Sequence, residues 1–558
     1  MTRSLFTLFL FLLCFFPKAQ NEFITIWKPS NTQPLFTMNP PFPSSATQVW
    51  IPVRGTNFTI SWEENGYPAH QLTMNNVTSS TSLLLDFGTS QNPNPNAATY
   101  TVKVSSGTGN FHQIMYRDPT LASAMNTMGD TAKITDIIQW GNTRWSSMEN
   151  AFAGCLNLNM TAADLPDLED VTTLNGMFLG CTSLTGNPSI DSWDISSVTS
   201  LTSTFSSCHL FNQPLNNWDT SNVTQMQNTF LLAKAFNQPL SDWDTSKVID
   251  MTSMFNNAHS FNQPLDSWDL SNNTDCEFMF SNAWAFNQPL NSWDVSNVTL
   301  FNYMFNKTLV FNSDISSWDT SSATNMTGTF QYSPLFNQNI SGWNTSNVTL
   351  MSVMFMGATS FNQNLGSWNT SQVTTMNNMF MGATSFNQNL GSWNLSSLLY
   401  AGSIFQNSGL NCQNYDSTIY GWSVNPATPG NINISSASPL IYTHPAAIAA
   451  RNYLINTKGW TIIGDSYDDK CASALSTKEN VIGNDFSIYP NPSTDFIYFK
   501  NFKNIESYKI FDTSGRIVLQ NSLLLNQNQI DIRILEKGNY ILQCKTESSL
   551  KTFKFIKK

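Results

Sequence analysis

Charged side chains are scarce in this sequence. Only 11% of its 558 residues are Asp, Glu, Lys or Arg, whereas an ordinary soluble domain carries about 25%. The 26 Lys and Arg are outnumbered by 37 Asp and Glu, which gives a formal net charge of −11. Because a surface of this charge repels phosphate backbones, the composition argues against nucleic acid as a partner.

Long hydrophobic runs are scarce as well. The apolar run at residues 5–16 is about 12 residues long, whereas a membrane-spanning helix needs about 20. It follows Arg3 and precedes Ala19, a pattern typical of a signal peptide cleaved after that alanine. Cys14 follows Leu13 rather than a small residue, which argues against a lipid anchor. We therefore expect residues 1–19 to be removed and the rest to be exported, with no transmembrane segment.

What the chain has in excess is aromatic residues, with 39 Phe and 17 Trp. Trp recurs at an unbroken spacing of 25 residues, and two Phe ladders run in the same register. A unit this small cannot bury its own apolar face, so the units are expected to stack as coils with each Trp over the next. The predicted Trp ladder comprises Trp193, Trp218, Trp243, Trp268, Trp293, Trp318, Trp343, Trp368 and Trp393.

Two local structures are expected in each unit. In one copy, the apolar residues of segment 248–255 recur at helical spacing after Ser246, which predicts a short helical turn with that serine as its N-cap. The preceding segment, 236–243, is the candidate short strand. The predicted fold class is therefore mainly β with short helical turns, arranged as a solenoid of 25-residue coils.

Two polar positions recur in the units. Asn follows the first Phe of each full copy, and we expect its amide to bond the backbone of its own or the next coil; a row of ligand-binding amides is the alternative. The residue after Trp is Asp in six coils and Asn in three, as at Asp244 and Asn344. An oxygen acceptor persists rather than a charge, which favours Asx turns; a calcium-binding ladder is the alternative. The Asn ladder comprises Asn212, Asn237, Asn262, Asn287, Asn312, Asn337, Asn362 and Asn387.

The regions outside the repeats complete the domain organisation. Residues 20–118 lack the period and alternate as short strands, which predicts an N-terminal Ig-like β domain. The solenoid follows at 119–410, and residues 411–465 form its C-terminal cap. A polar linker at 466–485 leads to residues 486–558, where 11 Lys and Arg face 6 Asp and Glu. This change in composition predicts a separate β-sandwich.

The repeat Phe-Asn-Gln-Pro-Leu-x-x-Trp-Asp-Thr-Ser-Asn-Val-Thr-x-Met resembles the BspA-like leucine-rich-repeat surface proteins of bacteria. The resemblance covers most of residues 22–465 and implies a leucine-rich-repeat-like solenoid and an association with adhesion, with no particular ligand identified. The tail is similar to the C-terminal sorting domains of type IX secretion, which implies a bacterium of the Bacteroidetes type and handling by that secretion machinery. It also implies export across the outer membrane, removal of the tail, and release or attachment to surface lipopolysaccharide. The residues that carry the second resemblance are Tyr489, Pro490, Asn491, Pro492, Gly538 and Tyr540.

Candidates for catalysis are few. The sequence has no nucleophile elbow, phosphate-binding loop or zinc-ligand spacing, so we expect no enzyme and no cofactor. His209 and His259 occupy one variable position of two coils, which we interpret as repeat drift. The predicted function is a secreted or cell-surface binding or adhesion module for a protein or glycan. A passive coat protein is the alternative, and a carbohydrate-active enzyme with carboxylates converging from different coils is less favoured.

Seven cysteines remain after the signal peptide. Three of them, Cys155, Cys181 and Cys208, occupy a position that later coils fill with small residues, so they are expected to act as small core residues. Cys412 and Cys471, one at each end of the cap, are the favoured disulfide pair. A bridge between adjacent coils, Cys155–Cys181 or Cys181–Cys208, is the rival.

Overall fold

The structure is a computed structural model that describes residues 21–32, 43–119, 128–471, 473, 487–500, 505–512, 516–522, 529–546 and 550–558. The chain divides into two compact units, Met1–Leu475 and Ser476–Lys558. The predicted signal peptide lies outside the described residues. The first unit contains β1 (Phe23–Trp27), β2 (Gln48–Ile51), β3 (Val53–Glu64), β4 (Tyr67–Ser79), β5 (Leu83–Asp86), η1 (Pro95–Ala97), β6 (Tyr100–Ser105), β7 (Asn110–Ile114), β8 (Ile134–Gln139), β9 (Asn159–Met160), η2 (Pro188–Ser192), α1 (Cys412–Val424), β10 (Ile441–Tyr442), α2 (Pro445–Asn456) and β11 (Ser466–Tyr467). The second contains β12 (Ser487–Tyr489), β13 (Phe496–Lys500), β14 (Ile505–Phe511), β15 (Ile517–Ser522), β16 (Gln529–Asp531), β17 (Gly538–Thr546) and β18 (Leu550–Lys557).

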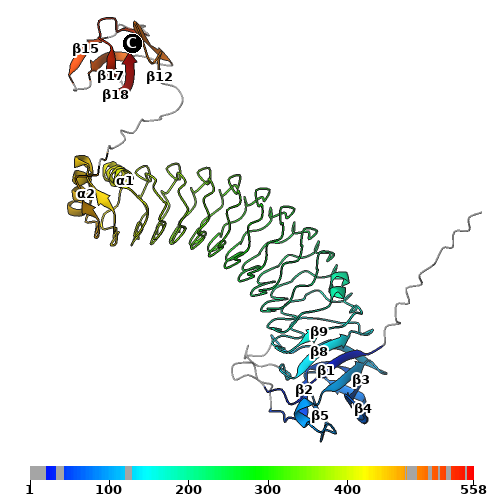
Figure 1. The fold of residues 1–558 in the computed structure, drawn as a ribbon. Helices are drawn as coiled ribbons and strands as arrows, with labels where there is room; N and C mark the ends of the chain where they lie inside the picture. Colours follow the sequence, from blue (N-terminus) through cyan, green and yellow to red (C-terminus); the bar gives the residue numbers. More distant parts are fainter. Residues whose placement is uncertain are drawn as a thin grey trace, which may run out of the picture. The chain divides into compact units, whose positions relative to one another are not determined.

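Seven strands form one sheet in the N-terminal part, in the order β4-β3-β6-β1-β8-β9 with β7 paired to β3. Alternation along β3 places Phe58, Ile60 and Trp62 in the core, where each is at most 6% exposed. Strand β8 pairs antiparallel with β1 and parallel with β9. The sheet thus continues past residue 118, where the sequence placed a domain boundary, into the first coils (Figure 1).

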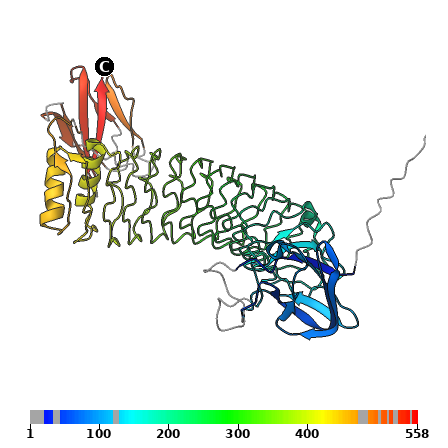
Figure 2. The same cartoon turned by 60° about the horizontal axis from the view of Figure 1, so that its bottom comes forward.

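The middle of the first unit is a row of 25-residue coils that lie side by side in both views (Figure 1 and Figure 2). One single-residue parallel bridge joins each coil to the next, as between Asp250 and Asp275. Alternate backbone N–H groups donate along the row, from Met251 to the oxygen of Asp275 at 3.1 Å and from Phe255 to the oxygen of Met279 at 2.9 Å. Main-chain hydrogen bonds therefore run from coil to coil.

The local structure of each coil differs from the prediction, although the chain is mainly β with few helices. Turns at 246–247 and 252–257 replace the helical turn, and segment 236–243 contains no strand. The bridge falls instead at Asp250. The reason is that Ser253 and Asn257 have left-handed φ values of 56° and 60°, which no α-helix tolerates. These two residues turn alternate N–H groups towards the next coil.

Aromatic rings fill the interior in register. The rings of Trp218 and Trp243 are 6.2 Å apart and inclined by 2°, and those of Phe230 and Phe255 are 5.6 Å apart. All nine Trp of the ladder are between 0% and 3% exposed. From Trp218 onward each indole N–H donates to a carbonyl of the preceding coil, as from Trp243 to Leu215 at 2.8 Å. The ladder is thus part of the core.

Helix α1 covers the last coil. Its Trp422 stacks 5.8 Å from Phe405, and its indole N–H donates to the oxygen of Leu390 at 2.9 Å, the bond that a ladder Trp would make. Cys412, the first residue of α1, is joined to Cys471 by a disulfide with a Cα–Cα distance of 6.5 Å. The rival cysteines Cys155, Cys181 and Cys208 are free and buried. Among the described residues, no helix is long and apolar enough to cross a membrane.

The second unit consists of a three-stranded sheet, β12-β13-β16, and a four-stranded sheet, β15-β14-β17-β18. Its own core includes Ile497, Ile510, Ile530 and Leu542, each at most 1% exposed. Strand β16 (Gln529–Asp531) was not expected from the sequence.

Candidate binding face

The amides of the Asn ladder are used inside the row of coils. The side-chain oxygen of Asn212 accepts from the backbone N–H of Asn237 at 2.9 Å and from the side chain of Gln238 at 3.0 Å. The backbone bond recurs in each following pair up to Asn387, whose oxygen accepts from Asn411. These oxygens therefore join one coil to the next.

The Asp position after each Trp closes an Asx turn. The carboxylate of Asp244 accepts from the backbone N–H of Ser246 at 2.9 Å, and the neutral Asn344 makes the same bond to Ser346 at 3.0 Å. Where the serine hydroxyl also donates, as Ser196 does to Asp194, it lowers the pKa of that carboxyl. Within the described residues, no group of three or more His, Cys, Asp or Glu is arranged to hold a metal ion.

Many residues that differ from coil to coil fall within one segment of the repeat, at 250–257 in one copy. We call the side that this segment forms the variable face; in the coil of residues 236–260 it consists of Asp250, Thr252, Ser253, Asn256 and Asn257. At the position of Asp250 the nine coils carry Ser200, Gln225, Asp250, Asp275, Leu300, Asn325, Leu350, Thr375 and Tyr400. At the position of Ser253 they carry Ser203, Asn228, Ser253, Phe278, Tyr303, Gly328, Val353, Asn378 and Ser403.

The turn geometry of the coil explains why most of these residues reach the surface, although Ser253 itself is only 8% exposed. Met251, Met254 and Phe255 point inward and are fully buried. Thr252 and Asn256, which lie between them, are partly exposed. The inward residues must fit the stacked core, whereas the outward ones are free to differ without disturbing it.

Carboxylates cluster on three positions of the variable face. Burial raises the pKa of Asp275 and Glu277, and the charge of Asp250 adds to the shift in both. The side chain of Gln227 donates to Asp250 at 2.8 Å, and Asn302 bonds Glu277 from the next coil. These carboxylates thus lie close enough to repel one another.

Aromatic side chains lie beside this cluster. The rings of Phe278 and Tyr303 stack 4.9 Å apart and are parallel to within 1°. A side chain at Gly328 would collide with the ring of Tyr303, so the small residue makes room for it. Tyr332, 40% exposed, lies 6.0 Å from the Lys307 ammonium. The face therefore combines acidic, amide and aromatic groups within a few neighbouring coils.

The variable face was not predicted from the sequence, because the predicted ladders consist of the positions that repeat. Its signal lies in the positions that do not repeat. An alignment of the nine copies places the changing residues at fixed offsets from Phe255, and the burial of their neighbours then identifies the exposed side.

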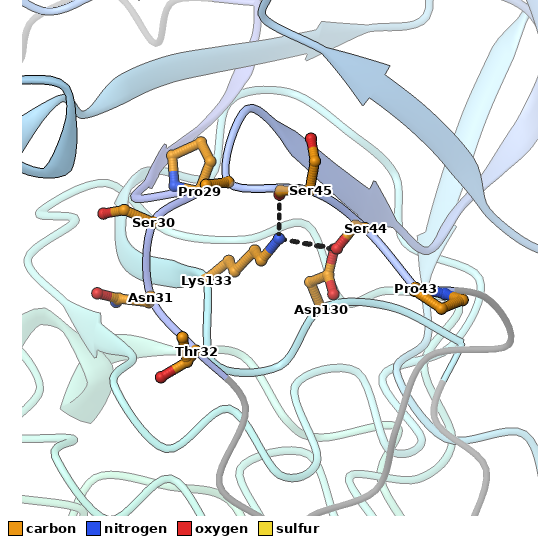
Figure 3. A pocket seen from close by; sticks show the side chains of 10 residues that line it. Pro29, Ser30, Asn31, Thr32, Pro43, Ser44, Ser45, Asp130 and Lys133 are labelled. Carbon is orange, nitrogen blue, oxygen red and sulfur yellow. Dashed lines mark hydrogen bonds and ion pairs between the residues drawn. The ribbon is translucent and has the colours of Figure 1, made fainter.

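A hollow of about 460 Å³ lies in the N-terminal part, beside Asp130 and Lys133 (Figure 3). The Lys133 ammonium donates to the hydroxyl of Ser44 and to the carbonyls of Ser45 and Gln48, all at 2.7–2.8 Å. Ser44 in turn donates to Asp130 at 2.7 Å. All three protons of the ammonium are donated to protein oxygens, so Lys133 and Asp130 hold the segment at 44–48 in place.

The predicted sorting-domain residues hold one turn against a sheet edge. The side chain of Asn491 donates to the oxygen of Lys554 at 3.0 Å and accepts from the N–H of Ile556 at 3.0 Å. Tyr540 stacks 5.6 Å from Phe555, and Tyr489 stacks 5.6 Å from Tyr498. Pro490 and Pro492 follow cis peptide bonds, and Gly538 begins β17.

Comparisons with known families cover both units. Residues 487–558 match a family described as a secretion system C-terminal sorting domain. The chain therefore carries a type IX sorting domain, which indicates a secreted or cell-surface protein.

Three overlapping stretches of the repeats, residues 146–259, 215–317 and 309–422, match a family described as "Mycoplasma protein of unknown function, DUF285". Neither match is to the BspA-like family. A search of curated proteins found no match to the chain.

Proposed function

We propose that this protein is an exported binding or adhesion module whose ligand, a protein or a glycan, contacts the variable face. The supporting observation is that the nine coils keep the buried Trp and Phe ladders, whereas the mostly part-exposed positions of the variable face change from coil to coil. Residues constrained only by folding repeat from coil to coil, as the Trp ladder does. Side chains that folding does not constrain can instead be retained in evolution because they contact a ligand.

The proposal includes the finer description of the fold as a leucine-rich-repeat-like solenoid between an Ig-like domain and a C-terminal cap. The 25-residue period and the single parallel bridge between successive coils support it. A binding role is favoured over an enzymatic one because the variable face combines acidic, amide and stacked aromatic groups rather than a pair of carboxylates alone.

The test is a glycan and protein array probed with the full chain and with two matched variants. Tyr303→Ser changes the variable face, and Gln288→Ala changes a position outside it, where seven of the eight full copies carry Gln and the side chain bonds Asn262 of the preceding coil. Loss of the array signal with the first variant alone supports the proposal. A signal that neither variant changes contradicts the assignment of the face, and a chain that binds nothing on either array favours a passive coat.

A further inference from the structure

One exposed position carries basic or aromatic side chains on four successive coils. It lies two residues beyond the position of Asn257, at the border of the variable face. We call these four residues the basic–aromatic strip: His209, Lys234, His259 and Trp284. At ~4.8 Å for each coil step, they span roughly 15 Å along the row.

One of the few basic residues of the coils lies in this strip. Residues 186–408 contain 13 acidic residues but only three lysines and no arginine, and one of those lysines is Lys234. The stretches that surround the strip contain no Asp or Glu: 207–214, 232–239, 257–264 and 282–289. In the described part of the chain, Lys234 is exposed and makes no ion pair. At neutral pH the strip thus carries one positive charge, that of Lys234, with no acidic residue in these stretches to offset it.

Backbone bonds hold the strip in register. The oxygens of His209, Lys234 and His259 each accept, at 3.2 Å, from an N–H of the following coil. The rings of His259 and Trp284 stack 3.7 Å apart and are inclined by 4°. Trp284 is 44% exposed, in contrast to the ladder Trp, which are 0–3% exposed. His259 covers one face of the indole, so a ligand would contact the part of Trp284 that stays exposed.

The pKa values of the two imidazoles depend in part on the lysine between them. Burial, and then the Lys234 ammonium, lower the pKa of both His209 and His259. At neutral pH both rings are therefore uncharged and can each donate one hydrogen bond. In mild acid they gain charge, which strengthens the attraction for an anion.

We propose that the basic–aromatic strip binds an acidic glycan, a chain of uronate sugars laid along the row of coils. The inference rests on the proposed function and assigns a ligand class to the edge of the variable face. The ammonium and the imidazoles suit carboxylates and hydroxyls, and the indole suits the apolar C–H side of a sugar ring. Groups that recur at each coil step match a polymer with repeating units better than a small anion.

The strip suits other anionic surfaces less well. An anionic membrane is recognised by clusters of about 4–8 Lys or Arg, and the strip has one lysine.

The experiment titrates the full chain with a galacturonate hexamer and with its fully methyl-esterified form, which has the same backbone without charge. Lys234→Glu is compared with Lys247→Glu, whose lysine bonds Asn222 at 3.0 Å in another column. Trp284→Ala is compared with Tyr420→Ala, since Tyr420 on α1 is 40% exposed. We expect Lys234→Glu to weaken hexamer binding about tenfold, and Trp284→Ala about fivefold, at low salt. The two controls should stay within about twofold, and affinity should rise between pH 7.5 and 5.5.

Three results would overturn the strip. The first is that the methyl ester binds as tightly as the charged hexamer. The second is that the Lys234→Glu and Trp284→Ala variants bind the hexamer as tightly as the unaltered chain. The third is that the chain binds phosphatidylglycerol vesicles but not the hexamer. If the chain does not bind the hexamer but keeps an array signal that depends on Tyr303, the proposal of a uronate-binding strip is wrong and the proposed function is still supported. A chain that binds neither the hexamer nor any array ligand overturns both.

Discussion

The indole N–H of Trp293 donates a 2.8 Å hydrogen bond to the backbone oxygen of Leu265 in the preceding coil. The ring itself lies 6.3 Å from that of Trp318 in the following coil. One side chain thus ties three consecutive coils together, through a polar bond on one side and ring packing on the other. Its repetition explains how coils with few strands hold a fixed spacing.

Replacing Trp293 tests these two contributions separately. Trp293→Ala is expected to lower the free energy of unfolding by about 3–5 kcal/mol, the range for a large aromatic side chain lost from a core. Trp293→Phe keeps most of the packing but leaves the Leu265 oxygen without its donor, at a cost of about 1–3 kcal/mol. Denaturant unfolding measures both values, and the half-exposed Trp284→Ala serves as the control. Equal effects of Trp293→Ala and Trp284→Ala would contradict the assignment of the ladder to the core.

Val353 adopts a left-handed conformation, with φ of 53°, that β-branched residues rarely accept. The equivalent residues of other coils include Asn228 and Asn378. Val353→Asn is therefore expected to raise the free energy of unfolding by about 1 kcal/mol, since Asn tolerates this backbone better. Differential scanning calorimetry checks the shift in Tm, and Val353→Ala, which retains the unfavourable backbone, is the comparison. A lower Tm for the Asn variant would show that packing of the valine outweighs its strain.

The raised pKa of Asp275 has a defined effect on stability. A carboxyl whose pKa is higher in the folded state favours folding below the unfolded value, about 4, and loses that contribution as the pH rises through the folded value. Asp275→Asn is therefore expected to raise the Tm at pH 7 and to leave it nearly unchanged at pH 3. Asp294→Asn is the matched control and should not raise the Tm, because hydrogen bonds from Ser296 lower the pKa of that carboxyl. No gain for Asp275→Asn at pH 7 would contradict the repulsion described for the variable face.

The disulfide between Cys412 and Cys471 closes a loop with a sequence separation of 59 residues. In the chain-entropy model such a bridge stabilises the folded state by about 4 kcal/mol. The double variant Cys412→Ser, Cys471→Ser should therefore lose hydrogen-exchange protection in α1 and α2 first, while the central coils stay protected. Uniform loss along the row would indicate that the cap and coils unfold as one cooperative unit.

The sequence allowed prediction of contacts that repeat, because a fixed period places identical residues at one angular position. Stacking of the Trp ladder and bonding of Asn212 to the next coil follow from that reasoning. The local conformation could not be derived in the same way. The apolar spacing of residues 248–255 fits a helix as well as a series of turns. Ser253 has a left-handed φ, but serine does not favour that conformation, so its identity does not predict the turn. Helix α1 was also not predicted, because it occurs once and has no repeat to reveal its role.

The candidate site was the least predictable part. Asp244 and Asn212 drew attention because they recur, yet both are used in turns and coil contacts. Tyr303 and Trp284 carry no motif, and their importance rests on exposure, which a sequence read alone does not supply. His209 and His259, interpreted from the sequence as repeat drift, belong to the proposed strip only because Lys234 and Trp284 occupy the same position on neighbouring coils.

The most direct test of the account is hydroxyl-radical footprinting of the full chain with and without a ligand selected on the arrays. The account predicts reduced labelling of Phe278, Tyr303 and Tyr332 on the variable face, with unchanged labelling of Tyr420 on α1. Unchanged labelling of those three residues in the bound state, with protection confined to positions that repeat in every coil, would contradict it.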